Sequence, residues 1–321
     1  MSGSEPYILV FGASVVDIFG FSKAKFRQYN STPGRVKMSF GGVCRNIAEN
    51  MARVGINTQF ISILGDDEKG RRMLDHAEVI GYDMTNSLVL KDGGTPTYLA
   101  ILDEKGVMVS AIADLDSIHE MNTEFIDSKA TIFENAEYVV VDSDDPEILE
   151  YVLTKFGDKT KFVLDPVSAE KAKSVKHLVK YFHTIKPNRF EAEKLLGFEI
   201  KDDSDLVRAA RVFHEEGVEK VFISLDEDGI FYSDGIDQGK IKAMEVTIKN
   251  VTGAGDAFVA GLGYGYYNDV DIVETVKFAI AMANIAIAHE ETINPDMKES
   301  MVREYMKTTE WVWESFKHIS N

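Results

Sequence analysis

Residues 250–261 read NVTGAGDAFVAG, and they join a strand-like run to a helix-like run. The preceding residues 241–248 carry Val, Ile and Thr, which favour a strand, whereas residues 257–267 can continue as a small-residue helix that packs closely on a sheet. We therefore place residues 253–256 in the first turn of a helix. A strand followed at once by a helix is the repeating unit of α/β folds.

This first turn offers an anion site with an acid beside it. Backbone N–H groups in a first turn have no intrahelical partner and carry the positive end of the helix dipole, so they can hold a phosphoryl oxygen. Gly253 and Gly255 let the backbone approach a ligand closely. Asp256 could take a proton from a hydroxyl while the amides stabilise the group under attack. The structural alternative has Thr252 as N-cap, the glycines as turn residues and Asp256 complementing the dipole.

The composition argues against several classes of protein. A net charge of −18 at pH 7 makes non-specific nucleic-acid binding unfavourable, because its electrostatic term would be repulsive. The single cysteine, Cys44, excludes an intrachain disulfide framework. No apolar run approaches the roughly 18 residues that span a bilayer, and residues 1–6 lack a signal-peptide pattern. We therefore expect a cytoplasmic protein with neither a nucleic-acid nor a membrane partner.

An acid follows the first expected strand. Residues 7–11 form an apolar run that ends at Gly12, as a buried parallel strand does, and Asp17 comes shortly after it. Ligands of open α/β sheets bind beyond the carboxyl ends of the strands. Asp17 could therefore accept hydrogen bonds from a polyol, although a solvated turn explains it as well.

A second glycine pair precedes a helix. Gly41 and Gly42 lead into residues 47–54, whose apolar spacing predicts a helix with Arg45 and Asn46 in its first turn. The glycines again suggest a close approach of the backbone to a ligand. Asn46 offers both a donor and an acceptor to sugar hydroxyls, or it merely starts the helix.

A small antiparallel unit interrupts the α/β rhythm. Residues 95–102 and 106–112 predict a hairpin, and residues 36–40 alternate like a strand with one exposed face. These segments could cover a site, as lids that exclude water do.

From residue 138 onward strands and helices alternate regularly, which predicts a doubly wound, mostly parallel sheet. The expected strands are 60–64, 138–141, 162–165, 184–186 and 220–225, with a hairpin in 229–241 and helices at 147–156, 169–179, 189–196 and 204–216. We expect the end of the chain to be helical over residues 272–289 and 301–317.

Two polar turns follow expected strands. Asn188 and Glu191 are three residues apart, so both could hold waters on a Mg²⁺ ion, which prefers oxygen ligands. A capping box fits the same spacing. Residues 224–229 could line a nucleotide pocket or form an acidic hairpin turn. The seven histidines show no metal-ligand spacing with cysteine.

Together these motifs resemble the ribokinase, or PfkB, carbohydrate kinase family in their order and approximate spacing. The resemblance spans nearly the whole chain and implies one three-layer α/β/α domain, residues 1–321, with a doubly wound, mostly parallel sheet and a small β-sheet lid from about residues 17–40 and 95–113. It also implies transfer of the γ-phosphoryl group of ATP, with Mg²⁺, to a hydroxyl of a small sugar or nucleoside. Such a transfer needs positioning and charge stabilisation more than covalent chemistry.

The resemblance gives roles to single residues. Asp256 is similar to the base that receives the hydroxyl proton, beside an anion hole of Gly253, Ala254 and Gly255. The sugar-binding positions match Asp17, Gly41, Gly42 and Asn46, the Mg²⁺-phosphate pair matches Asn188 and Glu191, and the nucleotide-binding positions match Ser224, Asp226, Gly229, Thr252 and Asn284.

Two positions depart from the family pattern. Asn250 stands where the family usually has Asp, in many members within a monovalent-cation loop, so activation by K⁺ stays open. Asp226 stands where the nucleotide turn usually has Gly, which makes that pocket more acidic and the preference for ATP less secure than the phosphoryl transfer itself.

Within the family, four segments are most similar to the pseudouridine kinase branch: residues 31–34, 41–50, 113–116 and 250–252. That branch implies phosphorylation of a ribose 5′-hydroxyl, with Asp17 and Asn46 reading the 2′ and 3′ hydroxyls and the lid reading the base. The alternatives are a kinase of a free sugar such as ribose or fructose, and a sugar-binding regulator without catalysis. Exposed faces of lid strands often pair in this family, so a homodimer through the lid is a further expectation.

Overall fold

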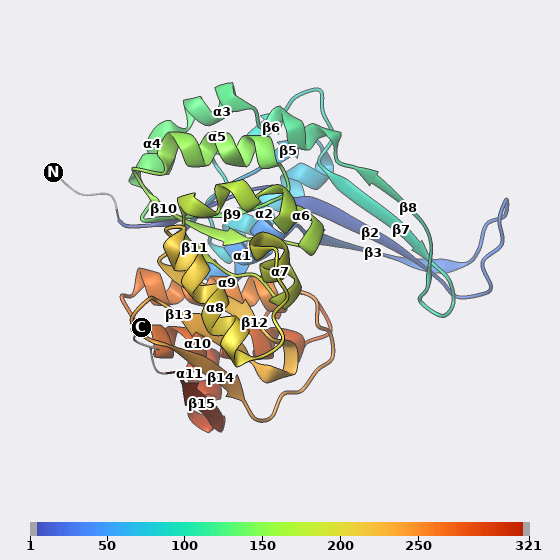
Figure 1. The fold of residues 1–321 in the computed structure, drawn as a ribbon. Coiled ribbons are helices and arrows are strands. Elements are labelled where there is room, and N and C mark those ends of the chain that lie inside the picture. Colours follow the sequence, from blue (N-terminus) through green and yellow to red (C-terminus); the bar gives the residue numbers. More distant parts are fainter. Residues whose placement is uncertain (1–4, 317–321) are drawn as a thin grey trace.

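A nine-stranded sheet runs through the body of the protein (Figure 1), in a computed structural model that describes residues 5–316. In order across the sheet the strands are β15 (Trp311–Ser315), β14 (Gln238–Ala243), β13 (Ile230–Ser233), β12 (Lys220–Ser224), β11 (Phe182–Ile185), β10 (Lys161–Asp165), β9 (Tyr138–Asp142), β1 (Ile8–Phe11) and β4 (Thr58–Ile61). The strands from β12 to β4 are parallel to one another, and β13, β14 and β15 extend the sheet in antiparallel pairs. The expectation of a mostly parallel, doubly wound sheet is confirmed.

The two faces of this sheet build two separate cores. Ile8 and Val10 of β1 belong to one core, whereas Leu9 and Phe11 belong to the other, as the alternation of a strand requires. The first core is covered by α1 (Val43–Arg53), α2 (Glu68–Ile80), α9 (Ala254–Tyr267), α10 (Ile272–Ile287) and α11 (Glu299–Thr308). The second is covered by α3 (Thr123–Ser128), α4 (Ala130–Asn135), α5 (Pro146–Phe156), α6 (Ala169–Ser174), α7 (Arg189–Leu196) and α8 (Asp203–Glu215). The predicted three-layer α/β/α arrangement is therefore present.

Close packing fixes α9 against α10. A Cβ atom built on Gly261 would lie 2.4 Å from the Ala279 Cα, and one on Gly265 would lie 2.2 Å from the Thr275 Oγ1. Only glycine allows this approach, so the small-residue run predicted after residue 256 is explained by helix packing. The first turn of α9 is thereby held at the edge of the sheet where the parallel strands end.

Across residues 5–316, no helix is long and apolar enough to cross a membrane.

A second sheet projects from the body as a lid (Figure 1). Its strand order is β3 (Gly34–Gly41), β2 (Val15–Ser22), β7 (Thr97–Leu102) and β8 (Met108–Asp114). β2 pairs with β3 in antiparallel and with β7 in parallel orientation, and β7 and β8 form the predicted hairpin. The sequence patterns did not predict β2. Asp17 lies within this strand of the second sheet and not in a solvated turn after β1.

Three predicted boundaries are wrong. Residues 60–64 form no single strand, because the chain leaves the main sheet at Ser62 and continues as β5 (Ile63–Gly65), which pairs with β6 (Leu88–Leu90). The strand expected over residues 241–248 ends at Ala243. The helix expected over residues 169–179 divides into α6 and the 3₁₀ helix η2 (Lys176–Tyr181).

The last predicted helix is also too long. α11 ends at Thr308, and Trp311 and Trp313 lie on β15, which pairs with β14. The Trp313 Nε1–H donates to the Tyr232 Oη at 2.9 Å, so a tertiary contact favours the strand over the helical pattern. Lys317, the last residue of the predicted helix, lies outside the described residues.

Candidate active site

The first turn of α9 has the predicted form. Gly253 adopts a left-handed backbone with φ 85° and is the N-cap, without a side-chain cap. The intrahelical hydrogen bonds begin with the Ala257 N–H, which donates to the Gly253 carbonyl at 3.0 Å. The N–H groups of residues 254–256 make no helical hydrogen bond, and the Ala254 N–H makes only a long one of 3.5 Å to the Val251 carbonyl, so this turn can bind an anion. Thr252 is exposed and does not cap the helix, so the structural alternative for this residue is wrong.

Asp256 meets Asn46 across the molecule. The Asn46 Nδ2 donates to the Asp256 Oδ2 at 2.8 Å, although 210 residues separate them in the sequence. Only 9% of Asp256 is exposed. Burial, followed by the nearby Asp165 carboxylate, raises the pKa of Asp256 to about 7. A carboxyl group with such a pKa can both accept and release a proton near neutral pH.

Asp17 and the glycine pair join this cluster from the lid side. A Cβ atom on Gly41 would lie 2.1 Å from the Asp17 Oδ2, so the carboxylate lies directly against that glycine. Gly42 has φ 98° and is the N-cap of α1, where a Cβ atom would lie 2.6 Å from the Ala13 carbonyl oxygen. Burial raises the pKa of Asp17, and the positive charge of Arg45 opposes this effect.

A buried ion pair lies under the anion site. The Lys186 Nζ and the Asp165 Oδ2 are 3.1 Å apart, and both side chains are less than 10% exposed. A Cβ atom on Gly255 would lie 2.8 Å from the Lys186 Nζ, so the ammonium group is packed against the first turn of α9. Burial acts to lower the pKa of Lys186, but Asp165 and Glu191 outweigh it and raise the pKa above its usual value. Sequence reasoning missed this pair; its only signal was that both residues end or follow parallel strands.

A large pocket opens on the other side of the first turn, with a volume of about 870 Å³. It contains four predicted residues, namely Ser224, Asp226, Gly229 and Asn284. Ala254, Gly255 and Lys186 also line it, and its apolar lining includes Phe258, Ile280, Ala283 and Ile287. The pocket thus joins the anion site to a space of nucleotide size. Thr252 does not line it, whereas the neighbouring Val251 does.

Asp226 stands in an unusual backbone conformation within this pocket. It begins the 3₁₀ helix η3 (Asp226–Asp228) with φ 52°. Asp is one of the few residues besides Gly that tolerate this conformation. Asp226 can therefore stand where glycine was expected without steric conflict, and its carboxyl group adds an acid to the lining of the pocket.

Asn188 and Glu191 form the capping box that their spacing allowed. The Asn188 Oδ1 accepts from the Glu191 N–H at 2.9 Å, and the Glu191 Oε2 accepts from the Asn188 N–H at 2.8 Å. Burial raises the pKa of Glu191. Within the described part of the chain, no group of three or more His, Cys, Asp or Glu residues could hold a metal ion directly. The carboxylate and amide oxygens of the pair keep lone pairs that can accept hydrogen bonds from water. The two residues therefore fit a Mg²⁺ ion that they bind through its water ligands.

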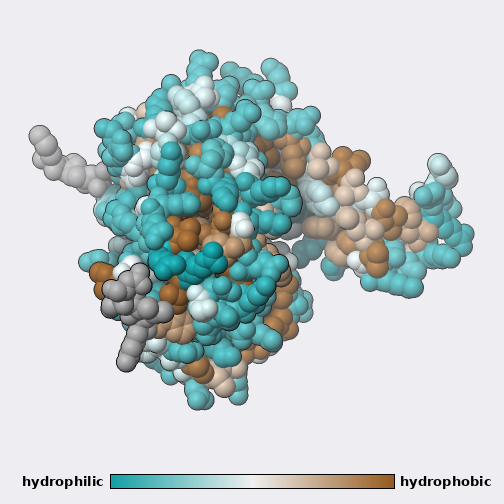
Figure 2. Space-filling model, in the orientation of Figure 1, coloured by the Kyte–Doolittle hydropathy of each residue, from teal (hydrophilic) through white to brown (hydrophobic). Residues whose placement is uncertain are grey.

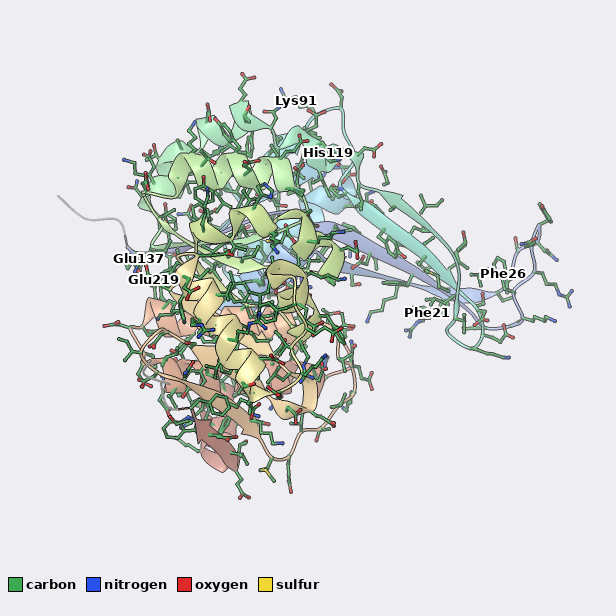
Figure 3. The ribbon with its side chains drawn as sticks, in the orientation of Figure 1. Phe21, Phe26, Lys91, His119, Glu137 and Glu219 are labelled. Carbon is green, nitrogen blue, oxygen red and sulfur yellow. The ribbon has the colours of Figure 1, made fainter. Side chains whose placement is uncertain are left out.

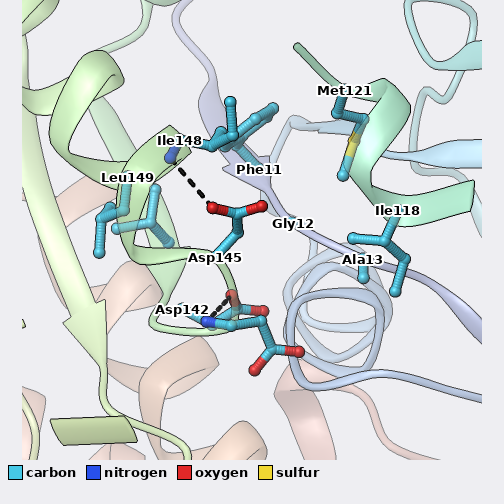
Figure 4. Close-up of a pocket in the computed structure, with 11 residues that line it drawn as sticks. Phe11, Gly12, Ala13, Ile118, Met121, Asp142, Asp145, Ile148 and Leu149 are labelled. Atoms are coloured by element: carbon cyan, nitrogen blue, oxygen red, sulfur yellow. Dashed lines mark hydrogen bonds between the residues drawn. The ribbon is translucent and has the colours of Figure 1, made fainter. Parts of the chain in front are cut away.

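A smaller cavity lies beyond the ends of β1 and β9 (Figure 4). Figure 4 shows Asp142 and Asp145 on one side, and Ile118 of the 3₁₀ helix η1 (Asp116–Glu120) and Met121 on the other. Asp142 is 8% exposed, and burial and the Asp144 carboxylate raise its pKa. Sequence reasoning did not find this cavity, because its lining comes from three segments that are far apart in the chain.

Comparison with known proteins assigns the chain to a family. A model described as the pfkB family of carbohydrate kinases matches residues 5–299. The chain is 32% identical over 308 residues to the pseudouridine kinase of Escherichia coli strain K12, covering 95% of this chain and 98% of that protein.

Solved structures agree. A candidate sugar kinase from Clostridium perfringens is 66% identical, with a TM-score of 0.96 over 97% of this chain and 99% of that one. A candidate ribokinase II from Escherichia coli, solved with ATP and Mg²⁺, has the same fold, with a TM-score of 0.80, 16% identity and coverage of 94% and 99%. The chain therefore belongs to the pfkB family of carbohydrate kinases, which are phosphotransferases that act on a sugar hydroxyl.

Proposed function

We propose that this kinase transfers the γ-phosphoryl group of ATP to the 5′-hydroxyl of pseudouridine. The observation that carries the proposal is the hydrogen bond between Asn46 and Asp256 at 2.8 Å, which joins a donor for sugar hydroxyls to a buried carboxylate beside the anion site. The match to the Escherichia coli pseudouridine kinase, which extends over almost the whole of both chains, supports this substrate.

Asp256 is the proposed general base. Its pKa of about 7 lets it take the hydroxyl proton as the hydroxyl oxygen attacks the γ-phosphorus. The backbone N–H groups of Gly253, Ala254 and Gly255 would stabilise the negative charge on the transferred group, aided by the positive end of the α9 dipole. These parts supply the positioning and the charge stabilisation on which phosphoryl transfer depends.

Ribose hydroxyls would bind to Asp17 and Asn46, next to Gly41 and Gly42. Both polar side chains are at least partly buried. A ribose hydroxyl that displaces water from them would therefore make hydrogen bonds in surroundings of low dielectric constant, where such bonds are stronger. The lid strand β2 carries Asp17, which links sugar binding to the lid position. A base attached to the ribose would lie under the lid, whereas a free sugar would leave the lid little to contact.

ATP would occupy the pocket of about 870 Å³, with its phosphates toward Gly255 and its remainder near Ser224, Asp226, Gly229 and Asn284. Thr252, next to the pocket, would approach the phosphates through its exposed hydroxyl, because its N–H donates to the Asn250 Oδ1. Asn188 and Glu191 would hold Mg²⁺ through water. The bound ion would neutralise charge on the phosphates.

We expect turnover without K⁺. The Asn250 Oδ1 accepts from the Thr252 N–H at 3.0 Å, and its Nδ2 donates to the Glu290 carbonyl at 3.2 Å. Both ends of this neutral amide are occupied, which supports a structural role for the side chain. Equal rates in Na⁺ and K⁺ salts would agree with this expectation.

The lid also suggests a homodimer. Apolar side chains gather on it (Figure 2), and Phe21 and Phe26 lie toward its far end (Figure 3). The exposed apolar residues of the lid include Val36, Leu99, Val107, Met108, Val109 and Ile112. We propose that a second copy of the chain covers this surface, since exposed apolar patches of this kind mark interaction sites. We further propose that the enzyme works in the cytoplasm on a small-molecule substrate.

The substrate proposal is tested with a panel of pseudouridine, uridine, adenosine, ribose and fructose, each with ATP and Mg²⁺. We expect pseudouridine to give the highest kcat/KM. A preference for ribose or fructose would contradict the substrate but leave the Asp256 chemistry in place; the naming of the Clostridium perfringens protein as a candidate sugar kinase makes this the second candidate function. No turnover with any of the five would favour the non-catalytic regulator.

A further inference from the structure

Arg45 lies behind the two residues that meet at the proposed base. It stands in the first turn of α1 and is 3% exposed. Its Nη1 donates to the Glu49 Oε2 at 2.8 Å, and its Nη2 donates to the Asn46 Oδ1 at 3.0 Å. Among residues 5–316 its Nε has no hydrogen-bond partner. A buried guanidinium group is costly, so its direct contact with a site residue calls for a functional explanation.

The contacts of Arg45 determine how the Asn46 amide is turned. A guanidinium group can only donate hydrogen bonds, and an ionised carboxylate can only accept them. With Arg45 on one side and Asp256 on the other, the amide oxygen must face Arg45 and the NH₂ group must face Asp256. An inverted amide would bring its oxygen against the carboxylate and its NH₂ group against the guanidinium. Arg45 therefore keeps a donor aimed at Asp256.

The charge around Arg45 is not cancelled. Glu49 pairs with Arg45 through Oε2 and with Arg53 through Oε1, so one carboxylate faces two guanidinium groups. His76 also contacts Glu49 at 3.1 Å. The cluster of Arg45, Glu49 and Arg53 thus carries a net positive charge at one end of the Asn46 amide.

Four charged groups must be considered around Asp256. The Asp165 carboxylate at the end of β10 raises the pKa of Asp256, and Lys186 after β11 and Arg45 on α1 lower it. Lys186 is already paired with Asp165, so its charge is largely compensated. Arg45 also opposes the rise that burial causes in the pKa of Asp17 on β2, and it lowers the pKa of Glu49 on its own helix.

We propose that Arg45 is a positioning residue for phosphoryl transfer, which holds the NH₂ group of the Asn46 amide toward Asp256 and so favours the ionised form of that carboxylate. This inference rests on the proposed function, because it requires Asp256 to act as the base. Arg45 itself needs no contact with either substrate.

The test compares pH profiles of kcat/KM for the unaltered enzyme, Arg45→Met and Arg53→Gln. Arg53 is the matched control, since it binds the other oxygen of Glu49 but does not contact Asn46. We expect the acidic limb of Arg45→Met to move to higher pH by about one unit, the size of shift that a nearby opposite charge produces. The limb of Arg53→Gln should move much less, because Arg53 does not contact Asn46.

Two additional variants keep the outcome clear. If Arg45→Met does not fold, Arg45→Met with Glu49→Gln removes the charges of both Arg45 and Glu49 and should show an upward shift. Glu49→Gln alone keeps the charge of Arg45 and should show no upward shift. An unmoved limb in the foldable Arg45 variant, or equal shifts for Arg45 and Arg53, would overturn the role of Arg45. Asp256→Asn is measured in the same experiment. If this variant loses turnover, an unmoved limb contradicts only the role of Arg45. If it keeps turnover, both the assignment of Asp256 as the base and the role of Arg45 are wrong.

Discussion

At the scale of single residues, the site depends on carboxylates in contrasting surroundings. Asp165 is paired with Lys186, whereas Asp256 has an uncharged donor, Asn46, as its hydrogen-bond partner. Burial and the Asp165 carboxylate raise the pKa of Asp256 to about 7, the hydrogen bond from Asn46 opposes this only in part, and Asp256 can therefore exchange a proton near neutral pH. The chemistry is thus set by which partner each carboxylate receives.

The raised pKa of Asp256 predicts the pH dependence of the unaltered enzyme. A protonated carboxyl group cannot accept a proton, so kcat/KM should rise with pH through about 7 and level off above it. Steady-state rates between about pH 5.5 and about pH 9 measure this. A flat profile over that range, with the protein folded throughout, would contradict the role of Asp256.

Gly255 provides a second residue-scale prediction. A methyl group there would lie 2.8 Å from the Lys186 Nζ, so either the first turn of α9 or the ammonium group packed against it must shift. We expect Gly255→Ala to lower kcat at least about tenfold, since a shift of about 1 Å at a reacting centre can cost about 100-fold. Gly94→Ala is the control, because a Cβ atom on Gly94 meets nothing within 4 Å. Similar kcat values for the two variants would argue against an anion hole at Gly255.

At the scale of elements, sequence patterns succeeded where a segment's own periodicity decides its structure. The parallel strands of the main sheet and helices such as α9 and α10 were predicted because apolar spacing reports burial directly. β2 was missed because it is half-exposed in the lid, and β15 was mistaken for a helix. In both cases pairing with a distant strand determined the conformation, and no local pattern reports such pairing.

The lid strand β8 allows a prediction about assembly. Every residue of β8 is exposed, and Ile112 is 66% exposed. If a second copy covers the lid, Ile112→Lys should shift the protein from dimer to monomer, because a buried charge without a partner is costly. The control is Ile236→Lys, at a site 77% exposed in the turn between β13 and β14. Light scattering after size exclusion measures the mass; an unaltered protein that is already monomeric would refute the dimer.

At the scale of the whole molecule, the fold gathers residues that are far apart in the chain at one edge of the sheet. The predicted glycine motifs, Asp17, Asn46 and Asp256 do come together there. Arg45 and the pair of Asp165 and Lys186 were not predicted as part of this group. Their importance depends on which side chains meet in the tertiary structure, and spacing along one chain does not contain that information.

The buried carboxyl groups at this edge also predict how global stability varies with pH. The pKa of Asp142 is raised by burial, so the unfolded chain ionises this residue first as the pH rises above about 4. Stability is therefore lost as the pH rises from there through the folded-state pKa. Asp142→Asn should be more stable than the unaltered protein at pH 8, by an amount on the order of 2 kcal/mol, and about equal to it below about pH 4.

Thermal or urea unfolding at the two pH values measures this difference. Asp158→Asn, at an exposed position, serves as the control and should change little at either pH. Destabilisation by Asp142→Asn at pH 8 would show that the ionised carboxylate is needed by the fold.

The central claim, that Asp256 activates a nucleoside hydroxyl for attack on ATP, is tested most directly by one comparison. The rates of pseudouridine 5′-phosphate formation by the unaltered enzyme and by Asp256→Asn are measured with ATP and Mg²⁺ at saturating substrate. We predict that the substitution lowers kcat by about 10²- to 10⁴-fold while both proteins stay folded, because it removes the base and little of the volume. Equal rates of 5′-phosphate formation by the two proteins would contradict the account.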